Sequence, residues 1–165
     1  FGVDLEVIKE LVTRVREATN KTLIVKLTPM VTDIRPFAEN SQQCGADGIS
    51  LINGLMGIAI DIEKRKSKLG RNISGGLTGP SIKPVAVRMV WLAAQKVDIP
   101  IIGIGGISSP EDAIEFLIAG ASAIQIGTAN LVNPRSGVDV INGINKYLIQ
   151  NKIESVQKLI GLFNI

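Results

Sequence analysis

The sequence predicts an α/β fold in which parallel strands alternate with helices. Aromatic residues make up only 4% of the chain and glycines number 17, so the core must be built mainly from aliphatic side chains. Short β-branched runs alternate with longer segments whose apolar residues recur at helical spacing. The strand-like runs are almost continuously apolar, as in parallel sheets covered on both faces. We therefore expect one helix followed by four strand–helix units, which fit half of an eight-fold barrel or a small open sheet.

The first part of the chain predicts two helices and two strands. Residues 3–19 carry apolar residues at helical spacing, and residues 22–27 (TLIVKL) form a short β-branched run that predicts a buried strand. Residues 33–44 predict a second helix, which Gly45 is placed to end. Residues 48–52 (GISLI) predict the second strand.

The second part begins with a segment that departs from this rhythm. Residues 56–78 are rich in lysine and glycine, and we interpret them as a long loop, which at this length is usually functional or disordered. Further on, Ser109 followed by Pro110 and two acidic residues is a typical helix start. The expected helices of this part cover residues 81–97, 109–120, 137–150 and 154–163, and the expected strands cover residues 100–104 and 123–126.

The charge and the residue inventory exclude several classes of function. The net charge is +3, and no aromatic residues interleave the one dense basic stretch at residues 64–71. We therefore expect a solvated loop there and no nucleic-acid partner. The chain has one cysteine, Cys44, and no histidine, which excludes a disulfide framework, a His/Cys zinc site and a Ser-His-Asp mechanism within it. We expect no metal site, and we expect Cys44 to be buried and inert.

Nothing in the chain resembles a targeting or membrane segment. Its first residues form a mixed-charge helix pattern rather than a signal peptide, and no apolar run is long enough to span a bilayer. The single cysteine fits a reducing compartment, so we expect a cytoplasmic location and no membrane partner. Because the chain opens directly into a helix at Phe1, we expect residues 1–165 to form a single partial domain.

Two neighbouring strand ends carry glycines. Parallel strands in α/β folds bind ligands at their carboxyl ends. Gly105 and Gly106 follow one predicted strand, and Gly127 and Thr128 follow the next. Glycines at such positions let backbone N–H groups approach an anion, and phosphate is the usual ligand. The pattern therefore predicts a phosphate site, and tight turns without a ligand are the alternative.

Lys26 and Asn53 are the polar residues of the other two strand ends. Lys26 lies within the apolar run IVKL and is expected to point into a barrel mouth or to pair with an anion, because burial of an unpaired charge is costly. A structural ion pair is the alternative. Asn53 precedes Gly54, a combination that is common in turns, but its amide could also face a polar ligand.

Several short motifs occur in an order that is more specific than any one of them. They are VKLTP at residues 25–29 with VTDI at 31–34, GADG at 45–48 with SLIN at 50–53, GGLTGP at 75–80 with IKP at 82–84, GIGGI at 103–107 and QIGT at 125–128. In this order they closely resemble the dihydroorotate dehydrogenases, specifically the catalytic subunit of the NAD-linked, two-subunit class. The resemblance runs from Phe1 to the final helix and implies the C-terminal half of a TIM (β/α)8 barrel.

The resemblance implies an FMN-dependent oxidoreductase of pyrimidine biosynthesis that oxidises dihydroorotate to orotate. It also implies two kinds of protein partner, namely an iron–sulfur, FAD-containing electron-transfer subunit and a second copy in a homodimer. Asn53 matches a substrate-binding asparagine, and Gly54 follows it at the substrate site. The FMN-binding residues that the resemblance implies are Lys26, Ile52, Gly79, Gly105, Gly106, Gly127 and Thr128.

The chain departs from the family pattern in three places. Met30 stands where relatives often have asparagine, and Gly54 stands where they usually have threonine, whose hydroxyl would add a hydrogen bond worth about 1 kcal/mol. The family's catalytic base is a cysteine in a Ser-Cys-Pro-Asn loop that precedes the segment matching Phe1. We therefore expect no catalytic residue in this chain and no activity from it alone, and Cys44 is not a candidate for the base.

The residues leave three alternatives open. A dihydropyrimidine dehydrogenase-like FMN domain shares several of the motifs, although the GGLTGP segment favours the dihydroorotate type. A phosphate-binding barrel without a redox role, such as a synthase or an isomerase, would share the glycine-bearing strand ends. An inactive assembly or truncation product is the third alternative.

Overall fold

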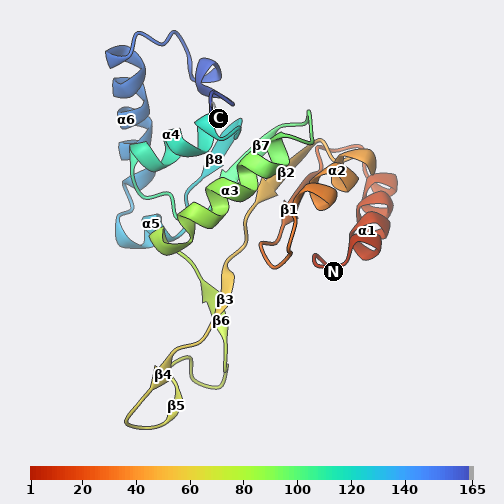
Figure 1. Cartoon of the computed structure of the whole chain (residues 1–165), viewed down its shortest axis with the longest axis vertical. Coiled ribbons are helices and arrows are strands. Elements are labelled where there is room, and N and C mark those ends of the chain that lie inside the picture. The colour runs from red at the N-terminus through yellow and green to blue at the C-terminus, as the bar shows by residue number, and fades with distance from the viewer. Residues whose placement is uncertain (164–165) are drawn as a thin grey trace.

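A four-stranded parallel sheet forms the centre of the computed structural model, which describes residues 1–163. The strands are β1 (Ile24–Leu27), β2 (Gly48–Leu51), β7 (Ile101–Ile104) and β8 (Ala123–Gln125), and they lie side by side in chain order. Helices alternate with these strands along the chain (Figure 1). The predicted α/β class with a parallel sheet is therefore confirmed.

Two of the helices begin at side-chain caps that the sequence supplies. Asp4 accepts hydrogen bonds from the backbone N–H groups of Glu6 and Val7 and thereby starts α1. Ser109 and Asp112 form a reciprocal capping box at the start of α4. The longer helices are α1 (Leu5–Ala18), α2 (Arg35–Gln43), α3 (Lys83–Ala94), α4 (Pro110–Ile118) and α6 (Ser136–Gln150).

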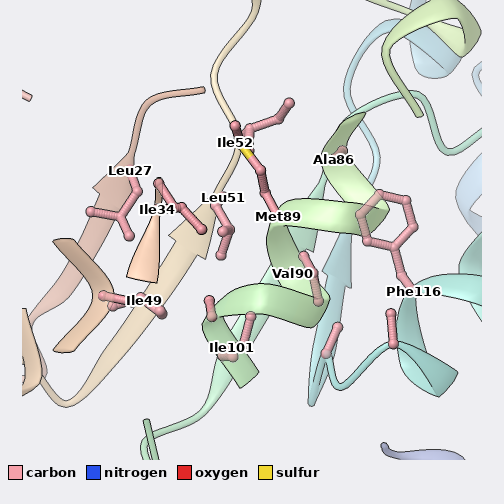
Figure 2. Close-up of a cluster of buried hydrophobic side chains, with 14 of the residues drawn as sticks. Leu27, Ile34, Ile49, Leu51, Ile52, Ala86, Met89, Val90, Ile101 and Phe116 are labelled. Carbon is pink, nitrogen blue, oxygen red and sulfur yellow. The ribbon is translucent and has the colours of Figure 1, made fainter. Parts of the chain in front are cut away.

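The hydrophobic core lies between one face of the sheet and the helices that cover it (Figure 2). The strand register places Leu27, Leu51 and Gly103 side by side, and both leucines are buried. A Cβ atom on Gly103 would overlap the ring of Phe116, which α4 carries into the core. Glycine at this strand position therefore allows α4 to pack closely on the sheet.

The opposite face of the sheet is covered only near its middle. Ser50 on β2 is buried, but Ile24 and Lys26 on β1 and Gln125 on β8 are exposed. The expectation that both faces of every strand are covered is therefore wrong for the outer strands. Their outer edges pair with no other strand within residues 1–163, so the described residues form an open sheet rather than a closed barrel.

An antiparallel arm replaces the structureless loop expected at residues 56–78. Strands β3 (Leu55–Gly57) and β6 (Gly75–Leu77) pair at its base, and β4 (Ile60–Asp61) and β5 (Lys66–Ser67) pair further out. The arm projects away from the sheet in Figure 1. Its apolar residues alternate along the chain with period two, which is a strand signal that the many lysines and glycines obscured. These alternating residues are Met56, Ile58, Ile60 and Ile62, and all are exposed.

The C-terminal region differs from the prediction in two elements. A helix at residues 154–163 was expected, but the structure has only a 3-10 turn at Val156–Leu159, followed by Gly161 in a left-handed conformation (φ 73°). A short helix, α5 (Thr128–Val132), follows β8 and was not predicted, because five residues are too few to show a helical period. Among residues 1–163, no helix has the length and hydropathy needed to cross a membrane.

Candidate phosphate and substrate site

A cavity of about 130 Å³ lies at the carboxyl ends of the four parallel strands. Every residue that the sequence assigned to cofactor or substrate binding contributes to its wall, although these residues come from five separate segments of the chain. The nine predicted residues in the wall are Lys26, Ile52, Asn53, Gly54, Gly79, Gly105, Gly106, Gly127 and Thr128. The fold thus gathers the predicted set at one place.

Gly105 and Gly106 make the turn after β7, and both have positive φ, at 138° and 79°. A Cβ atom on Gly106 would lie 2.8 Å from the carbonyl oxygen of Gly79 and 2.9 Å from the backbone nitrogen of Lys83. Gly79 also has positive φ, at 86°. Only glycine therefore lets these two loops approach each other so closely at the cavity wall. Within residues 1–163 the Gly106 N–H group donates no hydrogen bond, so it can serve a ligand.

Gly127 and Thr128 form the adjoining part of the wall. A Cβ atom on Gly127 would meet no atom within 4 Å, so packing within residues 1–163 does not require glycine there. Thr128 donates a hydrogen bond from Oγ1 to Oγ1 of Thr78, 2.9 Å away. This contact joins the loop after β8 to the base of the antiparallel arm, and it fixes the side of the cavity where α5 begins.

Lys26, Asn53 and Gly54 lie at the ends of β1 and β2. Lys26 is exposed and lines the cavity, and it forms no ion pair with any residue in 1–163. The structural ion pair considered for Lys26 is therefore not formed within the described residues. A Cβ atom on Gly54 would lie 3.1 Å from both the Leu77 carbonyl oxygen and Cγ2 of Thr78, so a larger side chain would need the arm to shift.

Some of the cavity wall was not predicted from the sequence. Thr78 lies within the GGLTGP motif, and its hydrogen bond to Thr128 depends on a pairing of distant segments that the motif alone does not reveal. Ile82 and Ile104 belong to the helix and the strand predicted there, and Ile107 appears only as the last residue of the GIGGI motif, because apolar residues at these positions carry no separate signal of binding. The unpredicted wall residues are Thr78, Ile82, Ile104, Ile107 and Ala129.

Cys44 lies outside this cavity. Cys44 caps the C-terminal end of α2, is only half-buried, and lies with Sγ 3.5 Å from Oδ1 of Asn40. It is therefore less buried than expected, and it is absent from the cavity wall. Across residues 1–163 no cluster of His, Cys, Asp or Glu side chains is arranged to hold a metal ion.

Comparisons with known proteins agree on one family. A sequence model described as dihydroorotate dehydrogenase matches residues 1–148. The chain is 53% identical over 161 residues to the dihydroorotate dehydrogenase B (NAD(+)) catalytic subunit of Alkaliphilus metalliredigens, covering 98% of this chain and 53% of that protein. It is 50% identical over 165 residues to the protein of the same name from Bacteroides fragilis, covering 100% of this chain and 54% of that protein.

The solved structures support the same assignment. A crystal structure of a dihydroorotate dehydrogenase from Eimeria tenella in complex with ferulenol superposes with a TM-score of 0.80 at 25% identity. The superposition covers 96% of this chain and 48% of that one, which confirms the prediction of half a barrel. The chain spans about half the length of the curated relatives it matches. The chain therefore belongs to the dihydroorotate dehydrogenase family.

Proposed function

We propose that this chain supplies the phosphate-binding half of the FMN site in a dihydroorotate dehydrogenase of the NAD-linked class. The observation that carries the proposal is the cavity whose wall unites all nine residues predicted from separate motifs. The dihydroorotate dehydrogenase family is flavin-dependent. The cavity is smaller than the roughly 300–1,000 Å³ of a typical cofactor pocket, so other residues of the protein would complete the site.

The glycine loops suit the phosphate group of FMN. Gly105 and Gly106 bring the backbone to the cavity wall at the end of β7, and Gly127 adds an open position at the end of β8. In (β/α)8 barrels, phosphate groups commonly bind at the loops after the last two strands. These residues, together with Thr128, would hold the phosphate through backbone N–H groups, without a positively charged side chain.

Lys26 and Asn53 suit the reacting end of the site. Lys26 would place a positive charge beside the flavin, which favours the uptake of electrons by that group. Asn53 would orient dihydroorotate through amide hydrogen bonds, since its side chain is exposed at the cavity wall. FMN, when bound, supplies the acceptor for the hydride that dihydroorotate loses. Oxidation to orotate also releases a proton, so a base from elsewhere in the protein is required.

The family resemblance extends the proposal to partners and location. The relatives are named catalytic subunits, which supports a second, electron-transferring subunit. The exposed apolar residues of the antiparallel arm support contact with another chain, such as a second copy in a homodimer. The single free cysteine supports a reducing, cytoplasmic location.

Flavin retention by the full-length protein tests this proposal. The purified protein should be yellow and should release FMN on denaturation. Gly106→Asp would place a carboxylate against the phosphate and should abolish FMN retention. Gly137→Asp is a matched control, because a Cβ atom on Gly137 meets no atom within 4 Å and the residue lies outside the cavity wall. Undiminished FMN in Gly106→Asp, or loss of FMN in both variants, would contradict the assignment of the phosphate site.

A further inference from the structure

Lys83 carries a charge next to the candidate phosphate site but does not line the cavity. It is the first residue of α3, and its Nζ lies 2.8 Å from Oδ1 of Asp112 and 2.5 Å from Oε2 of Glu115 on α4. The Lys83 and Asp112 side chains are 27% and 15% exposed, against 46% for Glu115. The pair with Asp112 is therefore the more sheltered of the two and the less screened by solvent.

Asp112 joins this ion pair to the turn that follows Gly106. Its Oδ2 accepts hydrogen bonds from the Ser108 N–H, the Ser108 hydroxyl and the Ser109 N–H, each 2.9 Å long. Burial acts to raise the pKa of Asp112, but the hydrogen bonds from Lys83, Ser108 and Ser109 outweigh burial and lower this pKa to about 2. The carboxylate is therefore charged at neutral pH and binds both Lys83 and the backbone at Ser108 and Ser109.

Lys83 also touches the phosphate site through its backbone. A Cβ atom on Gly106 would lie 2.9 Å from both Cβ and N of Lys83. The same side of Gly106 meets the carbonyl oxygen of Gly79, which precedes the turn into α3. Two glycines of the cavity wall thus meet at Lys83. The Lys83 side chain pairs with the carboxylate that holds Ser108 and Ser109, two and three residues beyond Gly106.

We propose that the Lys83–Asp112 ion pair is a positioning element, which holds the Gly106 turn against the Gly79 turn and so fixes the geometry of the phosphate site. The inference rests on the proposed FMN site. Neither side chain contacts the cavity, so each acts through the backbone of the glycine turns. Loss of the pair should therefore weaken recognition of the phosphate group and leave the rest of the flavin site largely unchanged.

The ratio of the dissociation constants for riboflavin and FMN separates these effects, since riboflavin lacks the phosphate. Both constants are measured on the flavin-free, full-length protein by fluorescence quenching. Lys83→Met should lower the ratio by about tenfold, because removal of one partner leaves the other charge partly buried and frees the turn. Lys83→Arg should keep the ratio close to its value in the parent protein, because arginine can still donate hydrogen bonds to Asp112.

Three further variants distinguish a loss of the ion pair from a general effect on folding. Asp112→Asn keeps an oxygen that can accept the capping hydrogen bonds but loses the ion pair, so it should lower the ratio as Lys83→Met does. In the double variant Lys83→Met, Asp112→Asn, the ratio should fall no further than in either single variant. Arg16→Met is the matched control, because Arg16 pairs with Asp47 at 2.9 Å with a similar exposure of 25%, and neither residue lines the cavity. It should leave the ratio unchanged.

The outcomes distinguish this inference from the proposal on which it rests. If the parent protein prefers FMN and both Lys83→Met and Asp112→Asn keep that preference, the positioning role is wrong. An equal loss in Arg16→Met would also overturn it, because the effect would then be a general one on stability. If the parent protein itself binds riboflavin as tightly as FMN, the proposed phosphate site fails, and the positioning role fails with it.

Discussion

The two ends of the parallel sheet are built in different ways. At the amino ends of the strands, side chains hold the loops: Arg16 donates hydrogen bonds to the Gly45 carbonyl oxygen and to Asp47, and Asp47 accepts from the Leu23 N–H. At the carboxyl ends, glycines let the backbone of separate loops meet around a cavity. The side chains that hold the loops thus lie at one end of the sheet and the proposed ligand site lies at the other, an arrangement typical of barrel enzymes.

Enlarging a glycine is the change with the largest expected effect at the carboxyl end. Gly105 has a φ of 138°, and a Cβ atom there would lie 2.8 Å from Cβ of Ala86. Gly105→Val should destabilise the full-length protein by about 3 kcal/mol and abolish FMN retention. Gly127→Ala should change stability by less than about 0.5 kcal/mol, because its surroundings are open. Denaturant unfolding measures the free energy of unfolding of both variants. Equal values for Gly105→Val and Gly127→Ala would contradict the close backbone approach at Gly105.

Lys26 tests whether the carboxyl end also contributes chemistry. Lys26→Ala should slow reduction of the bound flavin by about 100-fold, since a charge that acts on the electron-accepting step lowers its barrier. FMN affinity should fall much less. Stopped-flow absorbance under anaerobic conditions measures the reduction rate, and Lys21→Ala, an exposed change at the amino end, is the control. A reduction rate in Lys26→Ala equal to that of the parent would refute the assigned role.

Arg16 tests whether side chains at the amino end contribute to stability but not to FMN binding. Arg16→Met removes hydrogen bonds to the carbonyl oxygens of Thr19 and Lys21 as well as the pair with Asp47. It should lower the free energy of unfolding by about 1–2 kcal/mol. FMN content and turnover of the folded protein should stay at the parent values. A variant with parent-like stability but reduced FMN content would break the division between the two ends.

Asn53 should have a smaller effect that is confined to the substrate. Asn53→Ala should raise the KM for dihydroorotate by about tenfold, because one or two hydrogen bonds to the substrate are lost. FMN content should not change, since the resemblance assigns this residue to the substrate rather than to the flavin. Steady-state kinetics with a dye acceptor measure the KM, and loss of FMN in this variant would contradict that assignment.

The smallest effect concerns acid stability, to which both ends contribute. The pKa of Asp112 is lowered to about 2, and the backbone hydrogen bond from Leu23 and the side chain of Arg16 lower the pKa of Asp47. A carboxyl group with a lowered folded-state pKa stabilises the protein above its ordinary pKa, and this stabilisation is lost as pH falls toward about 2. Asp112→Asn should therefore reduce the loss of stability between pH 5 and 3 by a few tenths of a kcal/mol, and Asp47→Asn should change the pH dependence in the same direction. An unchanged pH dependence in both variants would contradict the assigned contacts.

The carboxyl end could be predicted from the sequence because its chemistry depends on residue type at strand ends. Gly105, Gly106 and Lys26 stand out against apolar runs, and the fold places them together. The amino end could not be predicted, because the contact of Arg16 with Asp47 joins residues 31 positions apart, and the GADG motif that contains Asp47 does not reveal its partner. The Lys83–Asp112 pair could not be predicted either, because its partners lie on different helices and the motifs that contain them do not show that they meet. Residue composition also hid the period-two pattern of the antiparallel arm.

A crystal structure of the full-length protein with FMN tests the central claim most directly. The account predicts phosphate oxygens within hydrogen-bond distance of the backbone N–H groups of Gly106 and Thr128, with the Lys83–Asp112 pair intact behind the turn. A phosphate group bound at any other place, with these N–H groups free of it, would contradict the account.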